Sequence, residues 1–292
     1  MKTHILVSMF TAGLAMTACG GRQSTLTQDA PVLEKKGDAS AQIAEGAGHF
    51  AKREDKAEVL LAIKAWEAAE QVDPTNAEIP LKLTYAYYFL ANAHIIWEDD
   101  EDSLKAAYDK GVIYGEKAIR LTTPAFAESI KNGKTWEASI PLVQKEGMAA
   151  LYWYATNLGR WATLDGITTL LSLKDRVFAI MEHCLKLDET FFHGAPHRYF
   201  GVAYTKVPFP SGDLPRSRKA FERAVELDGK YADTRVLFAE TYAVKAGDTE
   251  LFKKLLDETL ALPDDVYPDL VPETKNSKRK AKKLLGDVGD LF

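Results

Sequence analysis

Apolar residues recur every three to four positions along most of this 292-residue chain. The stretch 58–72 shows the pattern well, because its small and aliphatic residues share one helical face with Trp66 at the edge. The pattern stops at Asp73-Pro74, a sequence typical of a helix end followed by a new start. Convincing period-two alternation, the signal of a strand, is not found. The same period predicts helices over 58–72, 85–97, 106–121, 143–158, 174–187, 196–204, 214–227, 232–244, 249–262 and 277–285.

Some of these helices share a spaced set of small and aromatic residues. Ala62, Trp66, Ala69 and Pro74 have the spacing of the second helix of a tetratricopeptide repeat. Small residues at such positions allow neighbouring helices to approach closely, and the aromatic residue fills the groove between them. The fold class predicted is all-α: a tetratricopeptide-like array, a right-handed superhelix of helix pairs with irregular insertions. The same set recurs, with decreasing fidelity, at Ser217, Phe221, Ala224 and Gly229, at Val177, Met181, Cys184 and Glu189, and at Tyr114 and Ala118.

The chain opens with Lys2 and a mostly apolar run, Ile5 to Met16, that is too short to span a membrane. Cys19 directly follows this segment, as in a bacterial lipobox, where the cysteine is lipidated and becomes the first mature residue. We therefore expect a signal peptide over 1–18, a flexible lipid-anchored tether over 19–48 and one helical domain over 49–292. Gly20 favours the periplasmic face of the outer membrane. The alternative is a plain secreted protein that is cleaved nearby.

Composition restricts the function classes. The net charge is −5, and no basic stripe with interleaved aromatics points to nucleic acid. The only cysteines are Cys19 and Cys184. If Cys19 carries lipid, no disulfide can form within one mature chain, and Cys184 is expected to be a small buried hydrophobe.

The search for catalytic chemistry finds no phosphate-binding glycine loop, serine elbow or Cys-x-x-Cys pair. His193 and His197 are the best metal candidates, but Pro196 is typical of the first residue of a helix and separates turn from helix. We expect no enzyme activity, no cofactor and no metal. An enzyme with an unrecognised site stays open as a third reading.

Aromatic residues gather in three segments of the chain, 85–97, 152–161 and 191–204. Three consecutive aromatics at 152–154 cannot all face one core on a helix, so some must face a groove, a cavity or a partner. Packing between repeats is the alternative explanation for many of them.

Four stretches in this order resemble one known family: ALYWYATNLGRWATL, LKLDETFFHGAPHRYFG, PFPSGDLPRSRKAFERAVELDG and VLFAETYAV followed by DTELFKKLLDETL. Behind a lipoprotein signal, they resemble the T-component lipoproteins of tripartite ATP-independent periplasmic (TRAP) transporters. The resemblance implies a tetratricopeptide-like fold that tends to form a homotrimer. It also implies association with the transporter's periplasmic solute-binding protein and transfer of a ligand, which can be hydrophobic. The membrane would be reached through the lipid anchor only.

Under this reading the groove residues are expected to be Tyr152, Trp153, Asn157, Trp161, His197 and Tyr204. A rigid loop containing Pro208, Pro210, Gly212 and Asp213 is expected to line the groove or contact the partner, with Asp213 as the N-cap of the next helix. A stiff connection between repeats is the alternative for this loop. A second reading of the whole protein is a helical-repeat scaffold lipoprotein for outer-membrane or cell-wall assembly, with no small-molecule ligand.

Overall fold

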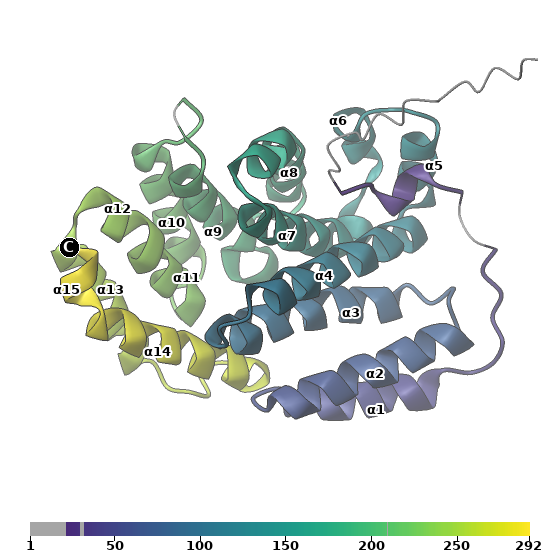
Figure 1. Cartoon of the computed structure of the whole chain (residues 1–292), viewed down its shortest axis with the longest axis horizontal. Coiled ribbons are helices and arrows are strands. Elements are labelled where there is room, and N and C mark those ends of the chain that lie inside the picture. Colours follow the sequence, from purple (N-terminus) through teal and green to yellow (C-terminus); the bar gives the residue numbers. More distant parts are fainter. Residues whose placement is uncertain (1–21, 30–31, 209) are drawn as a thin grey trace, which may run out of the picture.

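The computed structural model describes residues 22–29, 32–208 and 210–292, and this part of the chain is all-helical, as the periodicity predicts (Figure 1). The α-helices are α1 (Ser40–Phe50), α2 (Lys56–Val72), α3 (Glu78–Phe89), α4 (Glu101–Thr122), α5 (Pro124–Lys131), α6 (Trp136–Ser139), α7 (Met148–Asp165), α8 (Ile167–Leu187), α9 (Phe191–Lys206), α10 (Leu214–Leu227), α11 (Ala232–Leu237), α12 (Val244–Ala246), α13 (Thr249–Ala261), α14 (Val271–Gly286) and α15 (Val288–Leu291). Short 3-10 turns are η1 (Thr25–Thr27), η3 (Ile95–Trp97), η4 (Ile140–Leu142), η5 (Lys145–Gly147) and η7 (Pro268–Leu270), and π-helical turns are η2 (Leu90–His94) and η6 (Phe238–Ala243).

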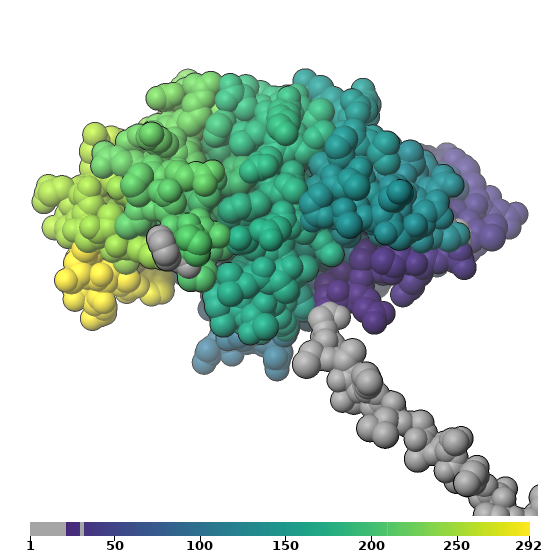
Figure 2. All heavy atoms as spheres, turned by 90° about the horizontal axis from the view of Figure 1, so that it is seen from above, coloured from purple at the N-terminus to yellow at the C-terminus, as the bar shows by residue number. Residues whose placement is uncertain are grey.

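Helices that follow one another in the chain pack as adjacent pairs, namely α1 with α2, α3 with α4, α7 with α8 and α9 with α10. Figure 2 shows these pairs joined into one continuous body. Helices α4 and α7 approach each other closely where α4 carries glycine. A Cβ added to Gly115 would lie 2.8 Å from Cα of Tyr154 on α7, so only glycine permits this spacing. All of the residues that form the repeated pattern on the helices are buried: Ala62, Trp66, Ala69, Tyr114, Ala118, Val177, Met181, Cys184, Ser217, Phe221 and Ala224.

The predicted helix boundaries fail where local backbone geometry changes. The stretch 85–97 was expected to be one helix, but the helix begins at Glu78 and its last turns widen into η2 and then tighten into η3. The helix predicted over 143–158 begins at Met148 and continues to Asp165. There Gly166, with φ of 119°, separates it from α8, which therefore starts at Ile167.

The segment before α2 corrects the prediction of a flexible tether. The signal peptide and Cys19 lie outside the described residues, but residues 22–29 pack on α4 and α5, and Leu26 is fully buried. Arg22 pairs with the buried Glu116 at 2.9 Å, and Glu116 also accepts a hydrogen bond from the backbone N–H of Thr25. Residues 40–48, expected in the tether, belong to α1. Composition could not reveal this, because the partner that orders the segment lies about 90 residues further along the chain.

The C-terminal helix α14 returns to the N-terminal hairpin and closes the array (Figure 1). Its Glu273 forms a two-pronged ion pair with Arg53, which lies between α1 and α2, at 2.8 Å for each hydrogen bond. Both side chains are buried. On the next turn, Asn276 accepts a hydrogen bond from the indole N–H of Trp97 at 3.3 Å. The two ends of the helical domain therefore meet and enclose the space between them.

Candidate ligand cavity

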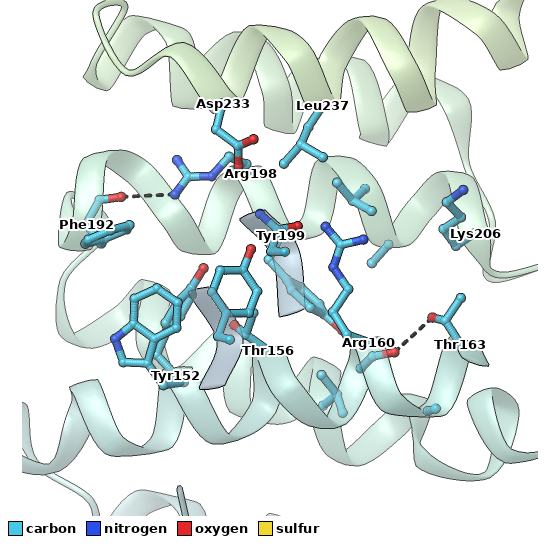
Figure 3. Close-up of a pocket in the computed structure, with 18 of the residues that line it drawn as sticks. Tyr152, Thr156, Arg160, Thr163, Phe192, Arg198, Tyr199, Lys206, Asp233 and Leu237 are labelled. Carbon is cyan, nitrogen blue, oxygen red and sulfur yellow. Dashed lines mark hydrogen bonds between the residues drawn. The ribbon is translucent and has the colours of Figure 1, made fainter. Parts of the chain in front are cut away.

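A cavity of about 130 Å³ lies inside this closed array. Its walls come from α3, α7, α8, α9, α11 and α14 (Figure 3). A space of this volume holds a benzene-sized group, and because it is partly open to solvent a longer molecule can extend from its rim. Its aromatic lining includes Tyr85, Tyr88, Trp153, Phe178, Phe192, Tyr199 and Tyr231.

One stripe of α7 forms the floor of the cavity. Tyr152, Thr156, Arg160 and Thr163 lie at intervals of three to four residues, so they project from the same side of the helix (Figure 3). The Thr163 hydroxyl is used within the helix, since it donates to the carbonyl oxygen of Gly159 at 2.8 Å. The Thr156 hydroxyl is buried and has no hydrogen-bond partner in the described residues. This stripe therefore presents unused polar atoms to an otherwise aromatic space.

A strained turn at the start of α9 places a second wall. Phe192, His193 and Gly194 have φ of 42°, 61° and 72°, a left-handed conformation that costs non-glycine residues about 1–3 kcal/mol each. Arg198 stabilises the turn by donating to the carbonyl oxygens of His193 at 3.0 Å and Phe192 at 3.2 Å. The turn holds the Phe192 ring edge-on to Trp153, with 5.1 Å between ring centroids. The guanidinium of Arg198 is thus committed to the architecture of the cavity.

The groups around the cavity are mixed in charge. Arg160 and Arg198 project into it, Asp233 faces them from α11, and Lys206 lies at the exposed rim (Figure 3). Burial lowers the pKa of Arg160, but the Tyr108 and Tyr88 hydroxyls and two acidic side chains raise it by a larger amount. The pKa of Arg160 therefore lies above its ordinary value, and the guanidinium stays charged. Burial raises the pKa of Tyr152 to about 12, which keeps its hydroxyl protonated at neutral pH.

Of the predicted groove residues on α7, Tyr152 and Trp153 line the cavity, whereas Asn157 and Trp161 do not. The amide of Asn157 donates to the carbonyl oxygen of Thr84 on α3 at 3.2 Å. Trp161 is 8% exposed and lies on the side of α7 that faces α4. One residue along an α-helix turns the side chain by about 100°, so Asn157 and Trp161 lie on a different side of α7 from Tyr152, Thr156 and Arg160, whereas the large ring of Trp153 still reaches the cavity. The predicted groove residues on α7 therefore lie on the helix that lines the cavity, and two of the four face into it.

The predicted residues on α9 also lie outside the cavity. The Nε2–H of His197 donates a hydrogen bond to the carboxylate of Glu189 at 2.9 Å, and both side chains are partly exposed. Tyr204 is buried against Phe178 and Phe200, with the Arg216 guanidinium 4.3 Å from its ring centroid. The face of α9 that does line the cavity carries Arg198, Tyr199, Val202, Ala203 and Lys206.

The proline loop runs from the cavity rim to the surface. Pro208 and Pro210 are exposed, while the preceding Val207 lines the cavity. Gly212 permits a tight turn, because a Cβ there would lie 2.2 Å from the carbonyl oxygen of Val207. The prediction that Asp213 caps α10 is confirmed, since its carboxylate accepts a hydrogen bond from the backbone N–H of Arg216 at 2.9 Å.

The histidine pair considered as a metal site is split. His193 bonds to Asp228 at 2.6 Å, while His197 bonds to Glu189, so the two rings have different carboxylate partners. Within the described residues no three metal-ligating side chains come together. Cys184 is buried, as expected, and burial raises the pKa of its thiol to about 12.

Arg160 is a charged residue of the cavity that the sequence analysis did not select. It falls at the end of the quoted aromatic segment, four residues after Thr156 and eight after Tyr152. That spacing was a usable signal, because it places a charged residue on the same face as an aromatic one that was already selected.

Fold and cavity together define a class: an all-helical protein, built of adjacent helix pairs, that encloses a small aromatic-walled space. The model of the TRAP transporter T-component family matches residues 56–292, and the chain belongs to this family. The family is a transport accessory family rather than an enzyme family. No curated protein matches the sequence closely enough to be named as a relative. None of the helices in the described residues is long and apolar enough to cross a membrane.

Proposed function

We propose that this protein is a lipid-anchored accessory of a TRAP uptake system that binds the periplasmic solute-binding protein and holds a small, largely hydrophobic ligand in its cavity. The family match over 56–292 carries the transport role. The aromatic cavity supports the ligand-binding role, because enclosed apolar spaces with a few polar groups are typical of small-molecule sites. Tyr152 and Trp153 are the predicted groove residues that contact this ligand.

The exposed part of the proline loop is the proposed partner contact. Pro208 and Pro210 restrict the backbone and Asp213 fixes its junction with α10, so little ordering entropy is lost when a partner binds. The neighbouring Lys206 and Val207 reach the cavity, which connects a partner at this loop with the bound ligand.

Lipidation of Cys19 would anchor the protein at the periplasmic face of the outer membrane. Replacing Cys19 by alanine is expected to abolish incorporation of labelled palmitate and to move the protein from the membrane to the aqueous fraction. Unchanged labelling in this variant would exclude Cys19 as the acceptor.

The helix pairs support a tetratricopeptide-like superhelix, and the family suggests a homotrimer as the assembly. Light scattering of the soluble form measures the mass directly. A mass of three chains supports the trimer, and a monomer at micromolar concentration contradicts it.

Affinity capture of the full lipidated protein from gently solubilised envelopes tests the transport role. Recovery of a TRAP solute-binding protein above background is expected. Recovery of barrel-assembly or cell-wall proteins instead would favour the scaffold alternative.

A matched pair of tryptophans tests the cavity. Trp153 and Trp161 both lie on α7 and are 7% and 8% exposed, yet only Trp153 lines the cavity. Their alanine variants should lose similar stability, about 3–5 kcal/mol, so a temperature-matched comparison isolates the cavity. Uptake of the transported solute should fall in the Trp153→Ala variant while partner capture is retained. Equal uptake defects in both variants would argue against ligand binding at this place.

A further inference from the structure

The charge in the cavity is not balanced. Three other buried or nearly buried arginines are satisfied by this chain: Arg22 by Glu116, Arg53 by Glu273 and Arg198 by backbone carbonyls. Like Arg198, Arg160 has no carboxylate of the described residues within ion-pair distance, and unlike Arg198 its guanidinium donates to no backbone carbonyl there. Its polar neighbours are the hydroxyls of Tyr88 and Tyr108. A partly buried guanidinium that is lined by aromatic rings and faces no anion at close range is a costly arrangement.

The acids around the cavity do not supply the missing anion. Glu273 accepts hydrogen bonds from Arg53 and from the Tyr85 hydroxyl at 2.7–2.8 Å, so its carboxylate is already used. Asp233 acts on Arg160 only at longer range. The exposed Lys206 adds a further positive charge at the rim of the cavity. The cavity is therefore left with positive charge that its own residues do not neutralise.

Two hydroxyl groups lie on the same face of α7 as this charge. The buried Thr156 hydroxyl, one helical turn before Arg160, has no partner in the described chain. Tyr152, one turn earlier on the same stripe, carries a protonated hydroxyl. Apolar walls flank the group on both sides, from Trp153 on α7 to Leu237 on α11. A planar guanidinium beside hydroxyl donors matches the geometry of a carboxylate, which accepts two parallel hydrogen bonds.

We propose that the cavity binds an amphiphilic organic acid, with its carboxylate on Arg160 and the Thr156 hydroxyl and its apolar body against Trp153 and Leu237. This deepens the proposed function and rests on the cavity being its ligand site. The acid can come from a small soluble solute or from a lipid-derived fatty acid, because both present the same carboxylate and apolar body.

Isothermal titration calorimetry with matched probes tests this assignment on the soluble protein. The probes are 3-phenylpropanoate and its neutral amide, 3-phenylpropanamide, with dodecanoate as the long-chain arm. The carboxylate should bind at least about tenfold more tightly than the amide, as expected for a hydrogen-bonded charge pair in an enclosed site. Preference for 3-phenylpropanoate over dodecanoate indicates a soluble solute, and the reverse preference indicates a fatty acid.

The Arg160→Met variant keeps an unbranched, flexible side chain and removes the charge. It should abolish the preference for the carboxylate over the amide, while Arg160→Lys retains part of it. Arg218→Met is the control, because Arg218 is exposed on α10 and pairs with Glu222 away from the cavity. Equal affinity for carboxylate and amide in the wild-type protein, a preference that survives in Arg160→Met, or no binding of either acid at millimolar concentration would each overturn the proposal.

Thermal unfolding without ligand separates a binding defect from a folding defect. Because Arg160 has no carboxylate partner, Arg160→Met should unfold at the same or a higher temperature than the wild-type protein. A large fall in unfolding temperature would mean that Arg160 is structural and would count against the proposal.

Different results would contradict the transport role and the carboxylate site. Loss of carboxylate binding with intact capture of the solute-binding protein removes the ligand assignment and leaves the transport role. Carboxylate binding without capture removes the transport role and leaves the anion site.

Discussion

Replacing Glu273 by leucine removes the carboxylate that closes the helical array onto its own N-terminal hairpin. The Arg53 guanidinium donates two hydrogen bonds to this carboxylate, both at 2.8 Å, and the Tyr85 hydroxyl donates a third at 2.7 Å. Arg53 is 7% exposed and Glu273 is 9% exposed. Leucine at position 273 therefore leaves a buried, unpaired guanidinium at the junction of the two ends of the domain.

Breaking one side of a buried ion pair costs about 3–5 kcal/mol, most of it from the charge that is left without a partner. We expect Glu273→Leu to lower the free energy of unfolding by this amount. Arg53→Met combined with Glu273→Leu should recover at least about 2 kcal/mol of the loss, because the double variant buries no lone charge. Arg53 also donates to the carbonyl oxygens of Phe50 and Asp269, which limits the recovery.

Urea unfolding followed by circular dichroism measures these free energies. The control is Glu54→Ala, which removes a second ion pair across the same junction, Lys275 to Glu54 at 2.8 Å. Both of its side chains are about half exposed, so its loss should cost under about 1 kcal/mol. A loss below about 1 kcal/mol in Glu273→Leu, or a double variant whose loss equals the sum of the single losses, would refute the reasoning.

Three further outcomes are expected. Glu116→Leu removes the buried partner of Arg22 and leaves it only the partly exposed Asp109, so it should cost about 1–3 kcal/mol, with faster trypsin cleavage at the N-terminal segment as the readout; unchanged cleavage would contradict it. Gly111→Ala places a Cβ 2.3 Å from Oδ1 of Asn157 and should cost about 1–3 kcal/mol in urea unfolding, a loss that Asn157→Ala in the same chain should relieve. Burial raises the pKa of the Cys184 thiol from 9.0 to about 12, so the thiol of the folded protein should resist iodoacetamide at pH 8. Because the unfolded chain loses this proton at a lower pH than the folded protein does, the free energy of unfolding should fall as pH rises from about 9 to 12, and Cys184→Ala should reduce that fall.

Much of the fold could be predicted from local patterns. The helices α2, α10 and α13 begin and end within two residues of the predicted ranges. Each of them has an aspartate N-cap whose carboxylate accepts a backbone hydrogen bond, a signal that lies within a few residues of the boundary. Two predicted boundaries were wrong. The helix α3 continues into a π-helical turn, and α8 begins directly after Gly166, which has a positive φ. Neither feature follows from the apolar periodicity.

The candidate site was only half predictable. Aromatic density on α7 points to a helix that lines the cavity, and Tyr152 and Trp153 are among its lining residues. Periodicity gives the spacing of a face but not which neighbour it meets, so it could not show that Asn157 and Trp161 face other helices. The role of Arg160 depends on tertiary structure, because α9 and α11 bring no carboxylate within ion-pair distance of it and Asp233 acts only at longer range.

Three properties of this chain could be predicted from its sequence: the all-helical fold, the burial of the small and aromatic repeat positions, and the family. Each of them depends on residues that lie close together in the chain. Only the tertiary structure decided that the segment 22–29 is docked through Glu116 and that α14 returns to Arg53. Each of these contacts joins residues roughly 90 to 220 positions apart, and a buried charge selects its partner by three-dimensional proximity, which no local pattern encodes.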